Sequence, residues 1–257
     1  MHTTFCDGKN TAEEMVTAAI ELGMTRMGFS AHPSMGFSTN WCMPPEVVIL
    51  YREEIARLKK KYEGQIEILC GIEQDYYSIM PTKGYDYVIG SVHGLKLGDG
   101  EYHGVDEGKD ELWAIIDRFY GSDPYAMAED YFTTVARLGE ISPDIIGHFD
   151  LVAKFNRAGD MFDETHPRYL AAAFSAVDAL LPLGVPFEIN TGAISRGYRD
   201  IPYPAPAIME YIAKKGGTFV FNSDSHKRET LCAGFDEWEE RLRGLARIER
   251  FEPKYIH

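Results

Sequence analysis

Residues 85–93 read YDYVIGSVH, a short run of β-forming residues that ends in a histidine. Five other runs share this character, being rich in Val, Ile, Phe or Tyr, or short and apolar, as buried parallel strands are. They cover residues 26–30, 66–72, 144–149, 186–190 and 218–222. The sequence therefore predicts at least six buried strands.

Helical patterns fall between these runs. They predict helices over residues 12–22, 45–61, 109–120, 124–138, 167–181, 206–215 and 235–245. Thr11 and Glu14 have the spacing of a capping box at the first helix start. Strands that alternate with helices indicate an α/β fold with a parallel sheet, either a barrel or doubly wound. Because no glycine-rich phosphate loop is present, the nucleotide-binding forms of the open sheet are disfavoured.

Composition narrows the possible functions. The chain has 257 residues, 45% of them hydrophobic, which excludes a disordered protein. Its 40 acidic and 26 basic residues give a net charge of −14, which repels long nucleic acids and anionic membranes unless a cation is bound. No apolar run approaches the ~20 residues of a membrane span, and no secretory signal is visible. Four scattered cysteines suggest reduced thiols, so we expect a cytoplasmic protein. No linker divides the chain, so we expect one domain over residues 1–257.

Possible metal ligands occur where the predicted strands end. They are His32, Glu73, His93, His148, Asp224 and His226, while two further candidates, His2 and Asp7, lie near the start of the chain. In a parallel barrel all strand carboxyl ends open on one face, so these side chains would converge. One histidine after a strand is ordinarily a hydrogen-bonded loop residue, but six such coincidences favour a common site.

The residue types suggest the chemistry of that site. Imidazole and carboxylate groups bind zinc, iron and manganese, and one carboxylate can bridge two such ions about 3.5–4 Å apart. Several cations in one pocket would neutralise a phosphate ester and make hydroxide available near neutral pH. Asp75, close to Glu73, is an alternative functional carboxylate, and Asp224 could instead cap a helix.

Taken in order, these motifs resemble those of the polymerase-and-histidinol-phosphatase (PHP) family. The matching segments are HTTFCDG (2–8), FSAH (29–32), GIE (71–73), GSVH (90–93), GH (147–148) and NSDSH (222–226), and they span essentially the whole chain. The chain is most similar to the histidinol-phosphate phosphatase branch, through residues 85–93 and through EINTG (188–192) followed by Arg196.

The resemblance implies a distorted (β/α)7 TIM-like barrel that holds two or three divalent metal ions, which could be zinc, iron or manganese. It assigns Glu73 as the carboxylate that bridges two ions. It further assigns His2 and Asp224 to the first ion, His93 and His148 to the second, and Asp7, His32 and His226 to the third. Glu73, Asp224 and His226 are the catalytic candidates among these ligands.

Two departures from the family pattern stand near the start of the chain. The first histidine of the family's His-x-His pair would precede Met1, as would most of the first barrel strand. We therefore expect that strand to be largely missing from this chain. Gly8 stands where several members of the branch carry histidine, which leaves the third ion to Asp7.

The expected activity is hydrolysis of a small phosphate monoester, L-histidinol phosphate, as a step of histidine biosynthesis. The resemblance implies that an arginine after residues 188–190 binds the phosphate, which makes Arg196 and Arg199 candidates. A guanidinium fork suits two phosphate oxygens. Lys154 and Arg157 could line the same mouth. Trp41, Tyr76 and Tyr198 could contact the imidazole end. Two alternatives stay open: a PHP-type phosphodiesterase or exonuclease, and a metal-poor pseudo-enzyme that binds a phosphorylated ligand. The sequence does not determine the oligomeric state.

Overall fold

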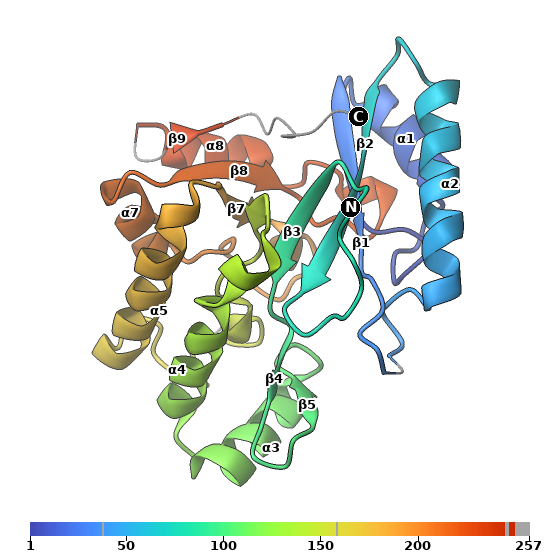
Figure 1. Ribbon diagram of the computed structural model, residues 1–257. Coiled ribbons are helices and arrows are strands. Elements are labelled where there is room, and N and C mark those ends of the chain that lie inside the picture. The colour runs from blue at the N-terminus through green and yellow to red at the C-terminus, as the bar shows by residue number, and fades with distance from the viewer. Residues whose placement is uncertain (38, 158, 245–246, 250–257) are drawn as a thin grey trace.

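The computed structural model describes residues 1–37, 39–157, 159–244 and 247–249. Its centre is a curled, parallel, seven-stranded sheet (Figure 1). The strands in spatial order are β1 (Arg26–Ala31), β2 (Glu67–Asp75), β3 (Tyr87–Ser91), β6 (Ile145–Ile146), β7 (Phe187–Asn190), β8 (Thr218–Asn222) and β9 (Arg247–Ile248). All six predicted strands are present, and the fold is the expected distorted α/β barrel.

Helices surround the outside of this sheet (Figure 1). They are α1 (Ala12–Glu21), α2 (Pro45–Lys61), α3 (Lys109–Tyr120), α4 (Pro124–Val135), α5 (Pro167–Leu180), the one-turn α6 (Gly192–Ser195), α7 (Pro206–Lys214) and α8 (Phe235–Leu242). Four 3₁₀ turns complete the set: η1 (Leu138–Ile141), η2 (Leu151–Ala153), η3 (Leu181–Leu183) and η4 (Arg228–Thr230).

The seven predicted helices all begin at the predicted residue. The first does so because the Thr11 hydroxyl accepts the Glu14 backbone N–H while the Glu14 carboxylate accepts that of Thr11, which confirms the capping box. The helix predicted over 124–138 ends at Val135, and a 3₁₀ turn follows it. The predicted end of the last helix, residue 245, lies outside the described residues.

Two features lie outside the six predicted strands. One is β9, whose two residues pair with Thr218 and Phe219 of β8 and are too few to show a periodic pattern. The other is an antiparallel hairpin of β4 (Gly94–Lys96) and β5 (Tyr102–Gly104), which lies beyond the carboxyl end of β3 (Figure 1). Its glycine-rich sequence is typical of a loop, but backbone pairing orders it.

The start of the chain lies between β1 and the segment after β8. The Ser30 backbone N–H donates to the Met1 carbonyl oxygen at 3.0 Å, and the His2 N–H donates to that of Ser225 at 2.9 Å. Residues 1–2 therefore connect the carboxyl ends of β1 and β8, although these strands do not pair with each other. This contact places His2 among the strand ends.

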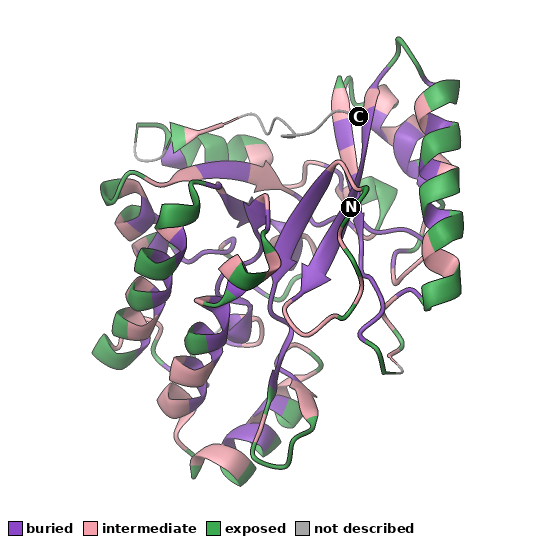
Figure 2. Cartoon of the chain, viewed as in Figure 1, coloured by how far each residue is buried: buried purple, intermediate pink, exposed green. Residues whose placement is uncertain are grey.

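The strands of the sheet are largely buried (Figure 2), and apolar side chains cover both faces. On the face toward α1 and α2, Ile68 and Ile72 of β2 pack with helical residues. The opposite face carries a separate small cluster made of Leu69, Tyr87, Ile89, Ile145 and Val220. Because side chains alternate along a strand, Glu73 points to the same face as Leu69. Among the described residues, no helix is both long and apolar enough to cross a membrane.

Candidate metal centre

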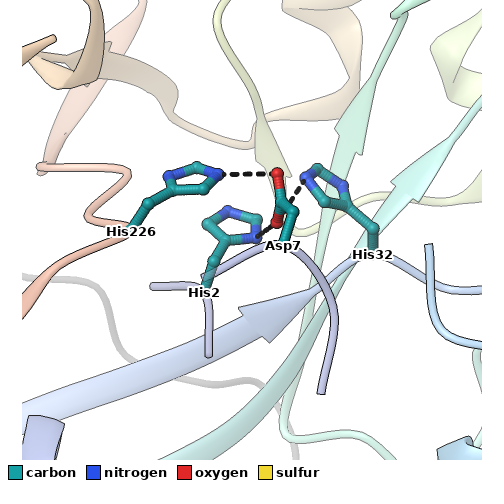
Figure 3. A group of neighbouring side chains, drawn as sticks. All are labelled: His2, Asp7, His32 and His226. Atoms are coloured by element: carbon teal, nitrogen blue, oxygen red, sulfur yellow. Dashed lines mark hydrogen bonds and ion pairs between the residues drawn. The ribbon is translucent and has the colours of Figure 1, made fainter. Parts of the chain in front are cut away.

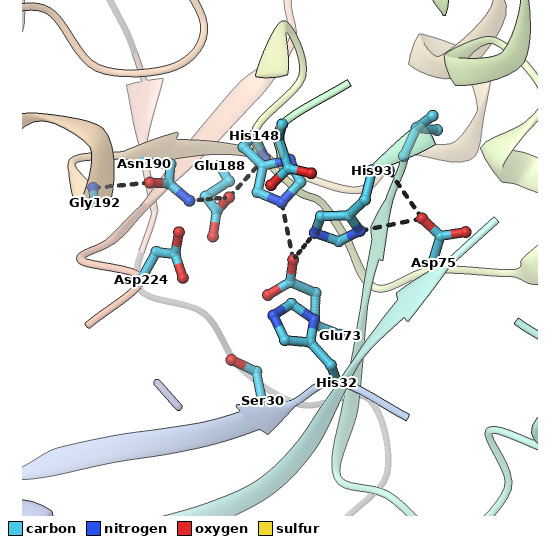
Figure 4. A network of polar contacts seen from close by, with 12 residues as sticks. Ser30, His32, Glu73, Asp75, His93, His148, Glu188, Asn190, Gly192 and Asp224 are labelled. Atoms are coloured by element: carbon cyan, nitrogen blue, oxygen red, sulfur yellow. Dashed lines mark hydrogen bonds and ion pairs between the residues drawn. The ribbon is translucent and has the colours of Figure 1, made fainter. Parts of the chain in front are cut away.

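Glu73 lies at the centre of a buried polar network (Figure 4). Its Oε1 is 3.1 Å from Nε2 of His93 and 2.8 Å from Nε2 of His148. Its Oε2 is 3.2 Å from Nε2 of His2. The end of β2 thus presents one carboxylate to three histidines that follow other segments of the chain.

Asp7 organises a second group at the mouth of the same site (Figure 3). Its Oδ2 is 3.1 Å from Nε2 of His226, and its Oδ1 is 3.6 Å from Nδ1 of His2. His32 approaches from the end of β1, with Nε2 3.9 Å from the Asp7 carboxylate. These four side chains are close enough to surround one cation.

Asp224 connects the histidine–carboxylate cluster to Arg196. Asp224 Oδ1 lies 3.0 Å from Nε2 of His2, whereas Oδ2 accepts a hydrogen bond from Arg196 Nη2 at 2.9 Å. His2, Glu73 and Asp224 form one group that could hold a cation, and His32, Glu73 and His93 form another. His148 lies outside these groups but contacts the shared Glu73.

The donor set fits divalent cations. Nδ1 and Nε2 of His93 each lie 3.1 Å from a carboxylate oxygen, although a neutral imidazole carries only one N–H. Nε2 of His2 lies close to carboxylate oxygens of Glu73 and Asp224, yet within the described residues neither it nor the buried Oδ1 of Asp7 makes a hydrogen bond of good geometry. Buried polar atoms are rarely left without partners. Ions between these nitrogens and oxygens would satisfy them.

The electrostatics of the cluster favour ionised carboxylates. Burial opposes ionisation of Glu73, but the neighbouring histidines hold its pKa well below the ordinary value. Burial lowers the pKa of His32 to about 3, so that imidazole is neutral and able to ligate. By contrast, hydrogen bonds with carboxylates, against the effect of burial, raise the pKa values of His2, His93 and His148. Carboxylates and imidazoles together make the ligand set that zinc, iron and manganese accept, and a bound cation would displace the protons of the imidazoles.

All eight predicted ligands come together at the floor of a cavity of about 850 Å³ or directly beneath it. Of the predicted substrate residues, Arg196 and Lys154 line this cavity, as do Trp41 and Tyr198. Tyr76 does not; its hydroxyl donates to Glu140 instead.

Arg199 does not belong to the described lining of the cavity, contrary to the expectation that it contacts phosphate. Its side chain is only 2% exposed, and its guanidinium donates to Glu164 at 2.8 Å and to the Ala153 carbonyl at 2.6 Å. Arg199 therefore stabilises the segment that carries Lys154, through its hydrogen bond to Ala153. Sequence position alone could not separate it from Arg196, because both follow the same strand.

Gly8 permits the close turn that carries Asp7. A Cβ on Gly8 would lie 2.4 Å from the Thr3 backbone nitrogen and 2.6 Å from the His2 carbonyl oxygen. With the backbone in this conformation, a histidine at position 8 would clash. The close approach of residues 2 and 3 therefore requires glycine at position 8, where several members of the branch carry histidine.

Three functional features carry a weak sequence signal or none. Asp75, considered only as an alternative to Glu73, contacts His93. Glu188 is buried and accepts the His148 backbone N–H at 2.7 Å, which fixes the segment after β6. Asp106 lines the cavity and accepts a hydrogen bond from Lys154 at 3.1 Å. It follows the glycine-rich hairpin, where no motif marks it.

A curled parallel sheet with a histidine–carboxylate cluster at its strand ends defines a barrel-type metalloenzyme. The PHP domain family matches residues 1–192 of the 257. The chain therefore belongs to the PHP family.

Two curated proteins that are similar to this chain over most of its length are both named as histidinol-phosphatases. The protein from Bacillus subtilis named histidinol-phosphatase is 27% identical, over 94% of this chain and 97% of its own length. That from Deinococcus radiodurans, named "probable histidinol-phosphatase", is 28% identical, over 88% of this chain and 85% of its own length.

Solved structures share the fold. A crystal structure from Listeria monocytogenes aligns with a TM-score of 0.77 and 22% identity, over 92% of this chain and 97% of the other. Histidinol phosphate phosphatase from Lactococcus lactis, complexed with zinc, L-histidinol and phosphate, aligns with a TM-score of 0.71 and 19% identity. That match covers 96% of this chain and 92% of the other.

Proposed function

We propose that this protein is a metal-dependent phosphomonoesterase that hydrolyses L-histidinol phosphate to L-histidinol and phosphate. The observation that carries the proposal is the position of Glu73, whose carboxylate contacts His2, His93 and His148 beneath an open cavity. The names of the relatives in Bacillus subtilis and Deinococcus radiodurans support the choice of substrate.

The residues that would hold the ions are those of the three groups around Glu73, Asp7 and Asp224, together with His148. Two or three divalent ions, of zinc, iron or manganese, fit this number of ligands. When bound, such ions supply a hydroxide nucleophile near neutral pH and neutralise phosphate oxygens. Zinc in the Lactococcus lactis structure supports that metal as a first choice for reconstitution.

Arg196 and Lys154 would bind and orient the phosphate. Arg196 is partly exposed, and its guanidinium already reaches both Asp224 and His226 at the floor of the cavity. Lys154 is held over the cavity because its Nζ donates to the carboxylate and the carbonyl oxygen of Asp106. Two fixed cations beside the ligand cluster suit a dianionic phosphate.

The other end of the substrate would meet aromatic side chains. Trp41 lies edge-on to His32, with 4.9 Å between ring centroids, and lines the cavity beside the ligands. Tyr198 lines the cavity too and lies under the Lys154 ammonium group. Flat apolar walls of this kind suit an imidazole ring.

We further propose that residues 1–257 act as one PHP-type domain and that the substrate is a small molecule. Four free cysteines are consistent with a reducing compartment such as the cytoplasm, where an amino-acid biosynthetic enzyme would work.

The test is phosphate release by protein loaded in turn with zinc, iron and manganese. L-Histidinol phosphate should be hydrolysed, whereas a thymidine phosphodiester should not. Release from the diester alone would indicate the phosphodiesterase side of the family. Metal binding with no release from either ester would rule out histidinol phosphate as the substrate. Failure to bind metal would favour the pseudo-enzyme.

Arg196→Gln tests the phosphate contact. Removing a charge-assisted hydrogen bond costs about 1.5–3 kcal/mol, so kcat/KM should fall by about 10- to 150-fold. The matched control is Arg157→Gln, because Arg157 is an exposed arginine paired with Asp200 and does not line the cavity. Equal rates for the two variants would remove Arg196 from the phosphate site.

A further inference from the structure

The His93 imidazole is held between two carboxylates of the same strand (Figure 4). Nε2 faces Glu73 Oε1 at 3.1 Å, and Nδ1 faces Asp75 Oδ2 at 3.1 Å. Glu73 and Asp75 are two residues apart on β2 and therefore point to the same face of the sheet. One strand thus supplies a carboxylate to each ring nitrogen.

Asp75 is itself fixed in place. Its Oδ2 also accepts the His93 backbone N–H at 2.8 Å, and its Oδ1 accepts the Tyr77 backbone N–H at 2.8 Å. The residue is only 1% exposed. The carboxylate therefore cannot turn away from the His93 ring without losing two backbone hydrogen bonds.

Two neighbouring histidines lack such support, whereas Nδ1 of His226 lies 2.9 Å from the Asp224 carbonyl oxygen. Nδ1 of His32 and Nδ1 of His148 are both buried and have no hydrogen-bond partner among the described residues. His148 has a carboxylate acceptor at Nε2 alone, Glu73 Oε1 at 2.8 Å, on the side where a cation would bind. His93 differs because an acceptor at Nδ1 requires the proton there, which leaves Nε2 free to ligate.

We propose that Asp75 is a positioning residue that holds His93 with its proton on Nδ1 and makes the Glu73–His93 pair the tightest-binding part of the metal centre. A carboxylate that accepts from the outer nitrogen of a ligating histidine fixes the ring and makes the other nitrogen more basic. The inference rests on the proposed metal centre but not on the identity of the phosphate ester.

The first test compares zinc affinity of the wild type and Asp75→Asn by competition with a chelator. Loss of such an outer carboxylate typically weakens metal binding 10- to 100-fold, and we expect that loss for one equivalent of zinc only. The matched control is Asp86→Asn: the Asp86 carboxylate also accepts a strand backbone N–H, that of Cys70, but at the opposite end of the sheet. It should bind every equivalent as the wild type does.

Excess zinc should restore the turnover lost in Asp75→Asn, because the defect is in metal affinity. Wild-type affinity for every equivalent in Asp75→Asn would overturn the proposal, as would an equal loss in Asp86→Asn. If Asp75→Asn weakens zinc binding as expected but the wild type releases no phosphate from L-histidinol phosphate, the proposed function fails and this inference stands.

The second test needs no variant and so does not depend on the folding of one. Long-range ¹H–¹⁵N spectra of the zinc-loaded wild type report which ring nitrogen carries hydrogen. We expect His93 to show a protonated Nδ1 and a metal-bound Nε2. Zinc on Nδ1, or a proton on Nε2, would overturn the proposal.

Discussion

Glu73 is the residue with the most contacts to the candidate ligands, since its two carboxylate oxygens contact three histidines. Glu73→Ala should lose metal and activity together, because one carboxylate serves more than one group of ligands. We expect at least one equivalent of metal to be absent after dialysis and kcat to fall by about 10³-fold or more. Metal analysis by mass spectrometry and phosphate release measure the two losses.

The control for this variant is Glu67→Ala on the same strand. Glu67 lies at the amino end of β2, pairs with Arg26, and is far from the strand end that carries Glu73. It should keep both its metal and its rate. Full metal content and turnover in Glu73→Ala would show that the assignment of the centre is wrong.

At the level of single residues, the sequence predicts ligands better than supporting groups. His32, His93 and His148 could be found because each follows a strand, and parallel strand ends converge. Arg196 and Arg199 could not be distinguished, since only the packed structure shows that Arg199 is buried against Glu164. A supporting role such as that of Asp75 depends on a distance, which no motif encodes.

At the level of elements, the close contact between β2 and β3 depends on a glycine. A Cβ on Gly71 would lie 2.3 Å from Cζ of Tyr87, whose hydroxyl is held by the Phe29 carbonyl oxygen at 2.8 Å. The ring therefore cannot move away without breaking that bond. Gly71→Ala should lower the free energy of unfolding by about 1–3 kcal/mol, and metal affinity with it, because Glu73 lies two residues further on.

Denaturant unfolding measures this loss, with Gly98→Ala as the control. A Cβ on Gly98 would have no atom within 4 Å, and the backbone there does not require a positive φ. The control should unfold within about 0.5 kcal/mol of the wild type. Similar values for the two variants would mean that the sheet tolerates the extra methyl group.

The Glu13 carboxylate of α1 pairs with Arg57 and Lys61 of α2, and its contribution to stability varies with pH. Hydrogen bonds from Lys61, Arg57 and Tyr62 lower the pKa of Glu13 to about 2, from an ordinary 4.5. A lowered carboxyl pKa stabilises the fold above 4.5, and that contribution is lost as the pH falls from 4.5 toward 2. Glu13→Gln should therefore melt slightly below the wild type at pH 7, and the difference should shrink between pH 5 and pH 3.

Thermal unfolding at several pH values measures this difference, and Glu21→Gln on the same helix is its control. Because Glu13 is partly exposed, added salt should also reduce the difference. A difference that stays constant down to pH 3 would mean that Glu13 acts through packing rather than charge.

The long elements could be predicted, whereas β6, which lies within the predicted run 144–149, is the one short strand that could be. Helix starts such as those at Ala12 and Pro45 carry local signals, a capping box or a proline, that act before tertiary packing. The two residues of β9 and the three of β4 have no such signal, because their pairing partners alone order them. Their prediction requires the neighbouring strands in place.

At the level of the whole molecule, the ligands tie together parts of the sheet that backbone pairing leaves separate. β1 carries His32 at one edge, while Asp224 and His226 follow β8 near the other, and the two strands do not pair. His2 lies between them and contacts Asp224 at 3.0 Å. Bound cations would therefore link both sides of the curled sheet, so we expect the metal centre to stabilise the folded state.

Metal removal should consequently lower the stability of the whole fold. An ion present at 100 times its Kd stabilises the native state by about 2.7 kcal/mol, which corresponds to about 5–10 °C in Tm for a chain of this size. We expect that increase when zinc is added back to protein stripped with a chelator. Glu73→Ala should respond much less, because it lacks the carboxylate that the groups share. An unchanged Tm in the wild type would show that the strand ends are held in place without the ions, by the backbone contacts of residues 1–2 with β1 and Ser225.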